Sequence, residues 1–278
     1  MIVAEFTALV LCAAFAAGFL GSLTGLGGGV IVTPVLTLFL GVDLRYAIGA
    51  TLIAVIATSS GAAAAYVRDG LSNIRIGMFL EIATTFGAVA GAYMGQHIPT
   101  RALSIVFGLV LLEAAWQSSR GQAASRAVLR PDPLGDKLNL NGMYNTGPAV
   151  EPYKVYRVKT GFGLMLGAGM LSGLLGIGSG SLKVIAMDRA MQIPFKVSTA
   201  TSNFMIGVTA AASASVYLSR GYVNPGIAMP VMLGVLAGSL FGARFLPHVP
   251  VEHLRRIFAV VVGLMALQMV VSGALGKI

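Results

Sequence analysis

The sequence is poor in charged residues, which make up only 10% of its 278 residues, against about 25% in typical soluble domains. It has one cysteine and three histidines. Cys12 has no disulfide partner within the chain, and we expect it to be a small buried residue in the first apolar run. His97, His248 and His253 lack metal-ligand spacing, so we expect no metal site. The sequence has no cofactor motif and no pairing of a nucleophile with a base that would indicate an enzyme. We therefore expect neither catalysis nor a cofactor.

Apolar residues are abundant instead. Hydrophobic residues make up 56% of the chain and the mean hydropathy is +0.84. Apolar runs of about 20 residues recur between short polar loops, and each is long enough to cross a bilayer core of about 30 Å. This composition predicts an all-α integral membrane protein in the inner or plasma membrane. The run at 2–22 lacks a preceding basic region and a following Ala-x-Ala site, so we expect a first membrane helix and not a cleaved signal peptide.

The two halves of the chain are related by an internal duplication. A shift of 151 positions superimposes them without a gap, and the matched residues include tyrosine, asparagine and proline as well as glycine. The matched pairs include Gly25 with Gly176, Gly29 with Gly180, Thr58 with Thr209, Tyr66 with Tyr217, Asn73 with Asn224 and Pro99 with Pro250. Duplications of this kind build many secondary transporters. We therefore divide the chain into a first membrane repeat (1–118), a polar cytoplasmic loop (119–159) and a second membrane repeat (160–278).

Each repeat has about five apolar segments. They run over 2–22, 26–41, 47–67, 75–96 and 101–118 in the first repeat, and over 160–176, 177–192, 198–219, 225–246 and 253–273 in the second. The second segment of each repeat is short and interrupted, by Pro34 in one case and by Lys183, Asp188 and Arg189 in the other. Such a segment either crosses the membrane or enters and returns, so each repeat crosses five times or four.

The net charge of +9 bears on the orientation of the protein, because basic residues gather in the cytoplasmic loops of membrane proteins. We therefore expect no nucleic-acid partner. With five crossings per repeat, 14 of the 19 Lys and Arg residues lie on one side and four on the other, with Lys183 inside the membrane. With four crossings the split is 11 to 7. The distribution favours five crossings, hence inverted repeats, with the central loop in the cytoplasm and both termini outside.

The central loop is the one substantial polar region. It contains turn sequences such as that at 139–142, and Tyr144, Tyr153 and Tyr156 indicate that it packs as a small cap. At about 40 residues it is long for a linker, so a functional lid and a mostly disordered segment are both open interpretations.

Glycine clusters interrupt both repeats, at 25–29 (GLGGG) and 176–180 (GIGSG). Glycine disfavours a helix interior by about 1 kcal/mol relative to alanine, and an irregular backbone exposed to lipid leaves its polar groups unsatisfied. The clusters therefore predict helices that are broken inside the protein, next to a cavity, as in transporters that bind substrate at such breaks. The alternative is that the glycines only allow helices to pack closely.

Lys183 follows the second glycine cluster by three residues and lies among apolar neighbours. An ionisable residue at membrane depth indicates a functional site, and a broken helix offers free N–H groups and a positive dipole end that favour an anion. We therefore predict that Lys183 contacts an anion. Two other interpretations stay open: the lysine reaches the membrane interface, or it pairs with Asp188.

Small polar residues open the third segment of each repeat, with Thr51 in the first and Thr201, Ser202 and Asn203 in the second. Facing a broken helix, such hydroxyl and amide groups would replace the hydration of an oxyanion, although the same groups often bond their own helix or a neighbouring one. Glu81 lies near the start of the fourth segment, where it serves either a proton relay or an interhelical contact.

With these motifs, the sequence resembles the TauE/SafE family of sulfite and organosulfonate exporters. The resemblance covers nearly the whole chain outside the central loop. It is carried by the motifs at 18–34 (GFLGSLTGLGGGVIVTP), 47–52 (AIGATL), 66–70 (YVRDG), 173–184 (GLLGIGSGSLKV) and 200–203 (ATSN). It implies a secondary carrier of small sulfur-containing anions, such as sulfite, thiosulfate or sulfonates, whose two repeats enclose one substrate path.

We therefore expect a non-enzymatic exporter of small anions that works by alternating access in the lipid bilayer. The predicted substrate contacts are Gly27, Gly28, Gly29, Thr51, Gly178, Ser179, Gly180, Lys183, Thr201, Ser202 and Asn203. Two other functions stay open, namely a channel-like pore for small solutes and a non-transporting membrane protein that recruits a partner through the central loop.

Overall fold

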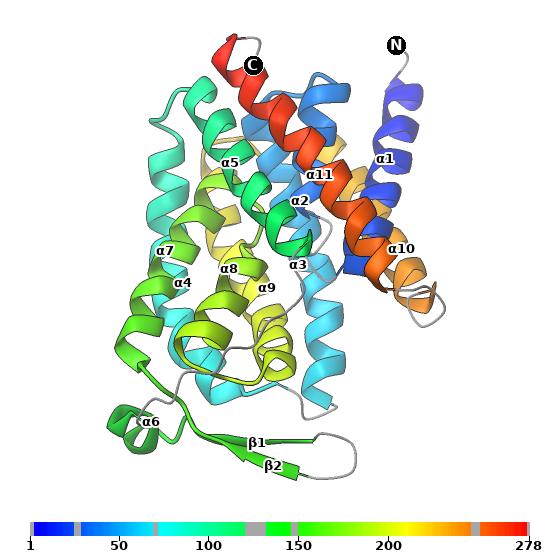
Figure 1. Cartoon of the computed structure of the whole chain (residues 1–278). Helices are drawn as coiled ribbons and strands as arrows, with labels where there is room; N and C mark the ends of the chain where they lie inside the picture. The colour runs from blue at the N-terminus through cyan, green and yellow to red at the C-terminus, as the bar shows by residue number, and fades with distance from the viewer. Residues whose placement is uncertain are drawn as a thin grey trace.

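The computed structural model describes residues 3–24, 29–68, 72–119, 132–145, 150–245 and 251–276, and these are almost entirely helical (Figure 1). The first half contains α1 (Val3–Thr24), α2 (Gly29–Pro34), the π-helical turn η1 (Val35–Phe39), α3 (Leu44–Arg68), α4 (Ile74–Gly95) and α5 (Thr100–Ser119). The second half contains α7 (Val158–Leu175), α8 (Gly180–Ile185), the π-helical turn η2 (Ala186–Ala190), α9 (Phe195–Ser219), α10 (Pro225–Phe245) and α11 (Val251–Ala274).

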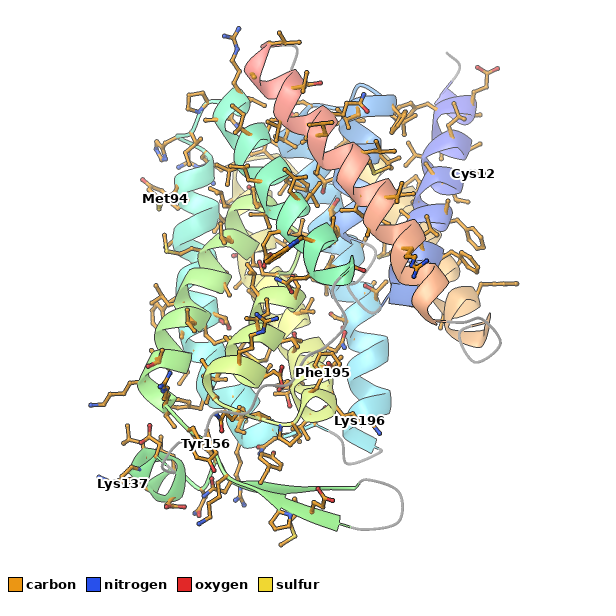
Figure 2. All side chains as sticks on the ribbon, viewed as in Figure 1. Cys12, Met94, Lys137, Tyr156, Phe195 and Lys196 are labelled. Atoms are coloured by element: carbon orange, nitrogen blue, oxygen red, sulfur yellow. The ribbon has the colours of Figure 1, made fainter. Side chains whose placement is uncertain are left out.

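The helices confirm the predicted all-α membrane protein. Five of the described segments are long and apolar enough to cross a bilayer, namely Ala4–Gly21, Ile74–Gly95, Thr100–Ser118, Val158–Leu175 and Pro225–Gly242. Their outward faces are apolar, as Phe86 illustrates with 71% of its surface exposed. An apolar exterior is stable in lipid and would be a liability in water. The expectation that Cys12 is buried is wrong, because its side chain is exposed on the outer side of α1 (Figure 2).

The short second segment of each half is a half-length helix. α2 and η1 together hold six α-helical and five π-helical residues, as do α8 and η2. Such a length spans about 16 Å, roughly half of a bilayer core. Each half-helix begins directly after a glycine cluster, so these segments begin in the interior of the protein and not at its surface.

Equivalent elements of the two halves start and end 151 residues apart, which holds for α2 and α8, for η1 and η2, and for α3 and α9. The halves pack crosswise, with α1 on α10, α4 on α7, α5 on α11 and α3 on α9. α5 and α11 run antiparallel, because Ser104 Oγ donates to Met269 O while a Cβ on Gly273 would approach Arg101 O. Both termini lie at one end of the molecule and the central loop at the other (Figure 1). Two inverted repeats are expected to have this geometry, and both the inverted arrangement and its orientation in a membrane stay predictions.

The described part of the central loop forms a cap at one end of the helices. It consists of the short helix α6 (Pro133–Lys137) and an antiparallel hairpin of β1 (Gly142–Asn145) and β2 (Val150–Tyr153). The Asp132 carboxylate accepts hydrogen bonds from the backbone N–H groups of Leu134 and Val158, so it begins α6 and ties the cap to the start of α7.

Close backbone contact holds α4 against α7. A Cβ added to Gly173 would lie 1.9 Å from Ala88 O, and one added to Gly91 would lie 2.0 Å from Met170 O. Small residues at such contacts allow helices to approach closely in a bilayer, where van der Waals packing drives association. The glycine stripes on α4 and α7 therefore serve packing, whereas the cluster at 176–180 separates α7 from α8.

We predict that Gly173→Ala lowers the stability of the protein by roughly 1–3 kcal/mol, because the added methyl group forces the two helices apart. The matched control is Gly167→Ala on the same helix, where an added Cβ meets nothing within 4 Å. The control is expected to leave stability unchanged or to raise it by the helix propensity of alanine. Thermal unfolding in detergent measures both variants. Equal losses in both would contradict the packing role.

Candidate functional site

The second glycine cluster forms a sharp break between α7 and α8. Gly176 ends α7 with a φ of +69°, and Gly178 and Ser179 follow with φ of +74° and +45°. This left-handed conformation is easy for glycine but costs roughly 1–2 kcal/mol for a residue with a Cβ. Ser179 is also 2% exposed, and its hydroxyl has no hydrogen-bond partner within the described structure. Backbone strain and an unsatisfied buried hydroxyl at the same residue indicate a functional position.

The start of α2 lies against the second break. A Cβ added to Gly29, at the start of α2, would lie 3.9 Å from Gly176 O and 2.6 Å from Val55 Cγ2. A Cβ added to Gly178 would lie 3.3 Å from Val55 Cγ1. The start of α2 and the second break therefore lie against the same residue of α3. Gly27 and Gly28, which belong to the predicted site, fall outside the described residues.

Two equivalent hydroxyls bind the half-helices. Thr51 Oγ1 lies 2.9 Å from Thr33 Oγ1 on α2, with both side chains fully buried. Ser202 Oγ donates a hydrogen bond of 3.2 Å to Gly180 O at the start of α8. Thr51 and Ser202 lie 151 positions apart, so each repeat uses the same position to hold its own half-helix. The structure thus brings Thr51, Ser202 and the described glycines of the prediction together.

The other two predicted residues of α9 make local structural contacts instead. Thr201 Oγ1 accepts a hydrogen bond of 3.0 Å from the backbone N–H of Asn73, at the start of α4. The Asn203 amide donates to Thr199 O within its own helix. In this conformation both side chains stabilise helices and have their polar groups satisfied away from the breaks.

Lys183 is fully buried and takes part in a polar chain across three helices. Its Nζ lies 2.5 Å from Thr209 Oγ1, and Thr209 Oγ1 lies 2.7 Å from Glu81 Oε1. Glu81 is 8% exposed and also accepts a hydrogen bond of 3.2 Å from Thr85 Oγ1, whereas its Oε2 has no partner in the described structure. The ammonium group therefore faces α4 through Thr209, and does not extend to the protein surface.

The position of this polar chain follows from the register of α4 and α9. Asn73 pairs with Thr201 and Glu81 with Thr209, and both pairs are separated by 128 residues. Eight residues separate the pairs along each helix, which is slightly more than two turns. The two helices therefore run parallel here, and the embedded carboxylate faces the embedded ammonium by way of a threonine.

Thr209 and Thr33 are the residues that sequence reasoning missed. Thr209 is the repeat equivalent of Thr58, but nothing in its neighbourhood along the chain identifies it as the group that joins a lysine to a glutamate. The signal that could have found it is the rule that a buried charge requires a partner, applied to Lys183 and Glu81 together.

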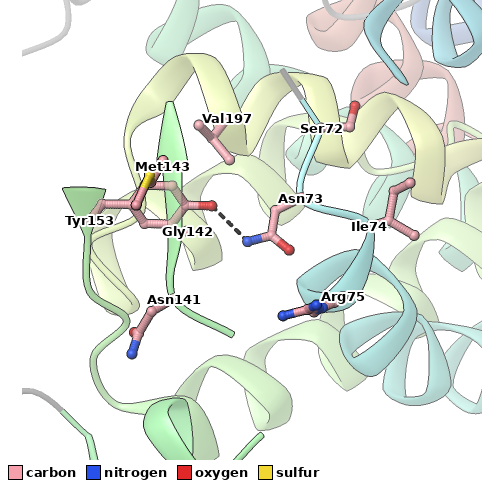
Figure 3. Close-up of a pocket in the computed structure, with 9 residues that line it drawn as sticks. All are labelled: Ser72, Asn73, Ile74, Arg75, Asn141, Gly142, Met143, Tyr153 and Val197. Atoms are coloured by element: carbon pink, nitrogen blue, oxygen red, sulfur yellow. Dashed lines mark hydrogen bonds between the residues drawn. The ribbon is translucent and has the colours of Figure 1, made fainter. Parts of the chain in front are cut away.

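A separate cavity of about 300 Å³ lies beneath the cap, between the start of α4 and the hairpin (Figure 3). Within it the Asn73 amide donates a hydrogen bond of 2.7 Å to the Tyr153 hydroxyl and another of 3.1 Å to Leu140 O. Burial raises the pKa of the Tyr153 phenol, which therefore stays neutral at physiological pH. The Asn73 side chain thus connects α4 to the cap, while its backbone connects α4 to α9. In the described part of the chain, no group of three His, Cys, Asp or Glu side chains is arranged to hold a metal ion.

Apolar helices, paired half-helices and a buried lysine joined to a buried glutamate together define a multi-pass membrane protein of the transporter class. The comparison with protein families agrees with this class. The family described as "Sulfite exporter TauE/SafE" matches residues 10–269. The chain belongs to this family.

The similar proteins are themselves described as transporters. The chain is 29% identical to a probable membrane transporter protein of Bacillus subtilis, YunE, over 92% of this chain and 94% of that protein. It is 26% identical to a probable membrane transporter protein of Methanocaldococcus jannaschii, MJ0441, over 94% of each. It is 24% identical to YdhB of Bacillus subtilis, also a probable membrane transporter protein, over 87% of this chain and 91% of the relative. No solved structure matches the chain.

We predict that Thr209→Val destabilises the protein by about 1–3 kcal/mol or more, because it removes the hydroxyl that joins Lys183 to Glu81 while keeping the shape of the side chain. Thr209→Ser is the matched control, since it keeps the hydroxyl and removes only a methyl group. Thermal unfolding of the purified variants in detergent measures the difference. A valine variant as stable as the serine variant would show that the polar chain is not held together by Thr209.

Proposed function

We propose that the protein is a secondary carrier that exports small sulfur-containing anions, such as sulfite, thiosulfate or organosulfonates, by alternating access. The observation that carries this proposal is the second helix break, where a strained, buried serine with an unsatisfied hydroxyl precedes a fully buried lysine. Ser179 and Lys183 are joined across one helical turn, because Lys183 N donates to Ser179 O at 3.1 Å. The two side chains therefore start from the same face of the half-helix.

The chemistry of these groups suits a small oxyanion. A hydroxyl without a partner donates its proton to an oxyanion, and an ammonium group supplies the opposite charge. Both groups lie at the centre of the protein, next to the place where Gly29 approaches Gly176. The family to which the chain belongs is described as sulfite exporters, and this supports a sulfur oxyanion as the substrate.

The paired architecture suits alternating access. Each half-helix is held to the long helix that follows it in its own repeat, by Thr51 of α3 in the first half and by Ser202 of α9 in the second. The long helices pair across the halves, as α1 with α10 and α4 with α7. We propose that one repeat moves against the other about the crossing of α3 and α9, which exposes the breaks first to one side of the membrane and then to the other.

We predict that Lys183→Met abolishes saturable exchange of sulfite and of methanesulfonate in proteoliposomes, because the methionine keeps the length of the side chain and removes its charge. The measurement is counterflow, in which labelled anion enters vesicles preloaded with unlabelled anion. The matched control is Lys196→Met, since Lys196 is exposed at the start of α9, and it is expected to exchange at the wild-type rate. Saturable exchange in the Lys183→Met variant would show that Lys183 does not belong to the substrate site, while the carrier function would stand.

The alternatives predict other results in the same assay. A channel-like pore conducts without saturation and shows no counterflow. A non-transporting partner protein moves none of these anions even when folded. If wild-type protein neither exchanges nor conducts sulfite, thiosulfate or methanesulfonate, the proposed function is wrong.

We further predict that the cap lies in the cytoplasm and the termini outside. Lys137 on the cap and Met94 near the end of α4 lie at opposite ends of the molecule (Figure 2), and the backbone N–H of His97 bonds to Met94 O. In a Cys12→Ser background, Lys137→Cys and His97→Cys therefore supply single thiols at the two ends. In intact cells, a membrane-impermeant maleimide is expected to label position 97 and to spare position 137 until the membrane is opened. The reverse pattern would invert the orientation, and equal labelling of both would contradict an odd number of crossings per repeat.

A further inference from the structure

Glu81 stands outside the site proposed above, yet it is tied to the lysine of that site. We propose that Glu81 is an internal counter-ion that the transported anion replaces, and that a proton bound by Glu81 accompanies each anion. The inference rests on the proposed function. It adds the coupling ion, its stoichiometry and the residue that carries it.

The geometry shows that Lys183 already has an anionic partner. Its ammonium reaches the Glu81 carboxylate through Thr209 in two steps of 2.5 and 2.7 Å. A substrate anion and an ionised Glu81 would therefore compete for the same positive charge. Low dielectric in the interior strengthens each pairing and makes an unpaired charge costly, so the ammonium group holds one anion at a time.

Thr209 is suited to connect and disconnect this pair. Its hydroxyl has one proton, which can be donated to Glu81 Oε1 at 2.7 Å or to Met205 O of its own helix at 2.9 Å. An ionised Glu81 attracts this proton and completes the chain to Lys183. Once the carboxyl is protonated, the hydroxyl can turn to the Met205 carbonyl, and Lys183 loses the negative charge that held it.

Glu81 also has a position at which to accept a proton. Its Oε2 has no hydrogen-bond partner in the described structure. The side chain lines a cavity of about 420 Å³ between α4 and α9, together with Thr85 and the largely apolar Met78, Ile82, Phe86, Phe204 and Val208. Glu81 and Thr85 are the polar groups of this lining, and Glu81 Oε2 is the carboxylate oxygen that is left to take up a proton.

The charged surroundings of Glu81 are simple. Lys183 is joined to it through the Thr209 hydroxyl. The other charged side chains of the elements around it are Arg75 on α4, Lys159 on α7, Lys196 on α9, and Asp188 and Arg189 on η2. Arg75, Lys159 and Lys196 are exposed at the ends of their helices. Within the described structure, a change in the charge of Glu81 is therefore felt first by Lys183.

The transport step balances in charge. In the unloaded state, an ionised Glu81 pairs with a protonated Lys183. In the loaded state, a proton from the aqueous phase has bound to the Glu81 carboxylate, and a monovalent anion pairs with the ammonium group. Both states have the same net charge, so one proton and one anion move together in the same direction, and the empty protein returns with its internal ion pair intact. Where the exterior is the more acidic side this coupling favours uptake, so export proceeds when the cytoplasmic concentration of the anion outweighs the proton gradient.

The test uses methanesulfonate, because its sulfonate stays ionised at any pH used, and any proton that moves with it is carried by the protein. Proteoliposomes with wild-type protein receive labelled methanesulfonate under a pH gradient of one unit, acidic outside. One proton per anion supports about tenfold accumulation, since one pH unit corresponds to a factor of ten. An entrapped pH dye is expected to report acidification of the interior during uptake.

Glu81→Gln is expected to retain counterflow at equal pH and to lose the accumulation driven by the gradient. Its apparent affinity for methanesulfonate is expected to rise at least about fivefold, in the range of ordinary coupling between sites, because the internal competitor has gone. Glu113→Gln is the matched control, since Glu113 is a part-buried carboxyl of α5 that bonds to Gln117 in its own helix. It is expected to accumulate methanesulfonate as the wild type does.

A measurement on wild-type protein keeps the test valid if Glu81→Gln fails to fold. Methanesulfonate is added to purified protein in weakly buffered detergent, and uptake of about one proton per bound anion is expected. Binding without proton uptake, or gradient-driven accumulation in Glu81→Gln, overturns the proposal while the carrier function stands. Absence of wild-type counterflow with every sulfur anion instead overturns the proposed function itself.

Discussion

The cost of an unpartnered polar group in the membrane interior governs this structure, and in its described part Ser179 Oγ and Glu81 Oε2 depart from it at and beside the proposed site. Long apolar helices satisfy their own backbones, so departures from helix occur only where protein covers them. The break before α8 meets this condition, because Gly176 lies against the start of α2 and Gly178 lies against Val55. The same cost places the Lys183 ammonium against Glu81 through Thr209. Irregular backbone and ionised side chains thus gather in the region where the two halves cross.

Much of the fold could be predicted from the sequence, because its signals are local or periodic. Apolar length locates the helices, and the shift of 151 positions places equivalent elements correctly, down to the bounds of α3 and α9. The short second segments are recognisable from Pro34 and from the charges near Lys183. What the pattern does not show is their half length, because apolar runs continue past the point at which the helices end. The burial of Cys12 was predicted wrongly. Every face of a membrane helix is apolar, so an apolar sequence does not show whether a small residue faces lipid or protein.

The candidate site was predictable only in part, because a motif identifies residues but not their partners. The glycine clusters, Thr51 and Ser202 share one place because the duplication repeats the same local design in each half. Thr201 and Asn203 carry the same polar chemistry one position on either side of Ser202, yet a helix turns each side chain by about 100°, so neighbours face different elements. The contact between Glu81 and Thr209 spans 128 residues. It depends on the register of two packed helices, which no local pattern encodes.

The duplicated positions are equivalent in the two repeats, whereas the charged residues of the polar chain are not, and this difference bears on function. Thr51 and Ser202 are equivalent positions with equivalent tasks, as the scaffold of two similar repeats requires. Lys183 is equivalent to Val32 and Glu81 to Met232, so the first repeat lacks the ammonium group and the second lacks the carboxylate. A symmetric scaffold allows the protein to open to either side with similar energy. Lys183 and Glu81, one from each half, place an internal charged pair across that scaffold, and every conformation must either hold this pair together or separate it. We therefore expect anion selectivity and ion coupling to depend on the residues that differ between the two repeats, and the opening motion to depend on the duplicated scaffold.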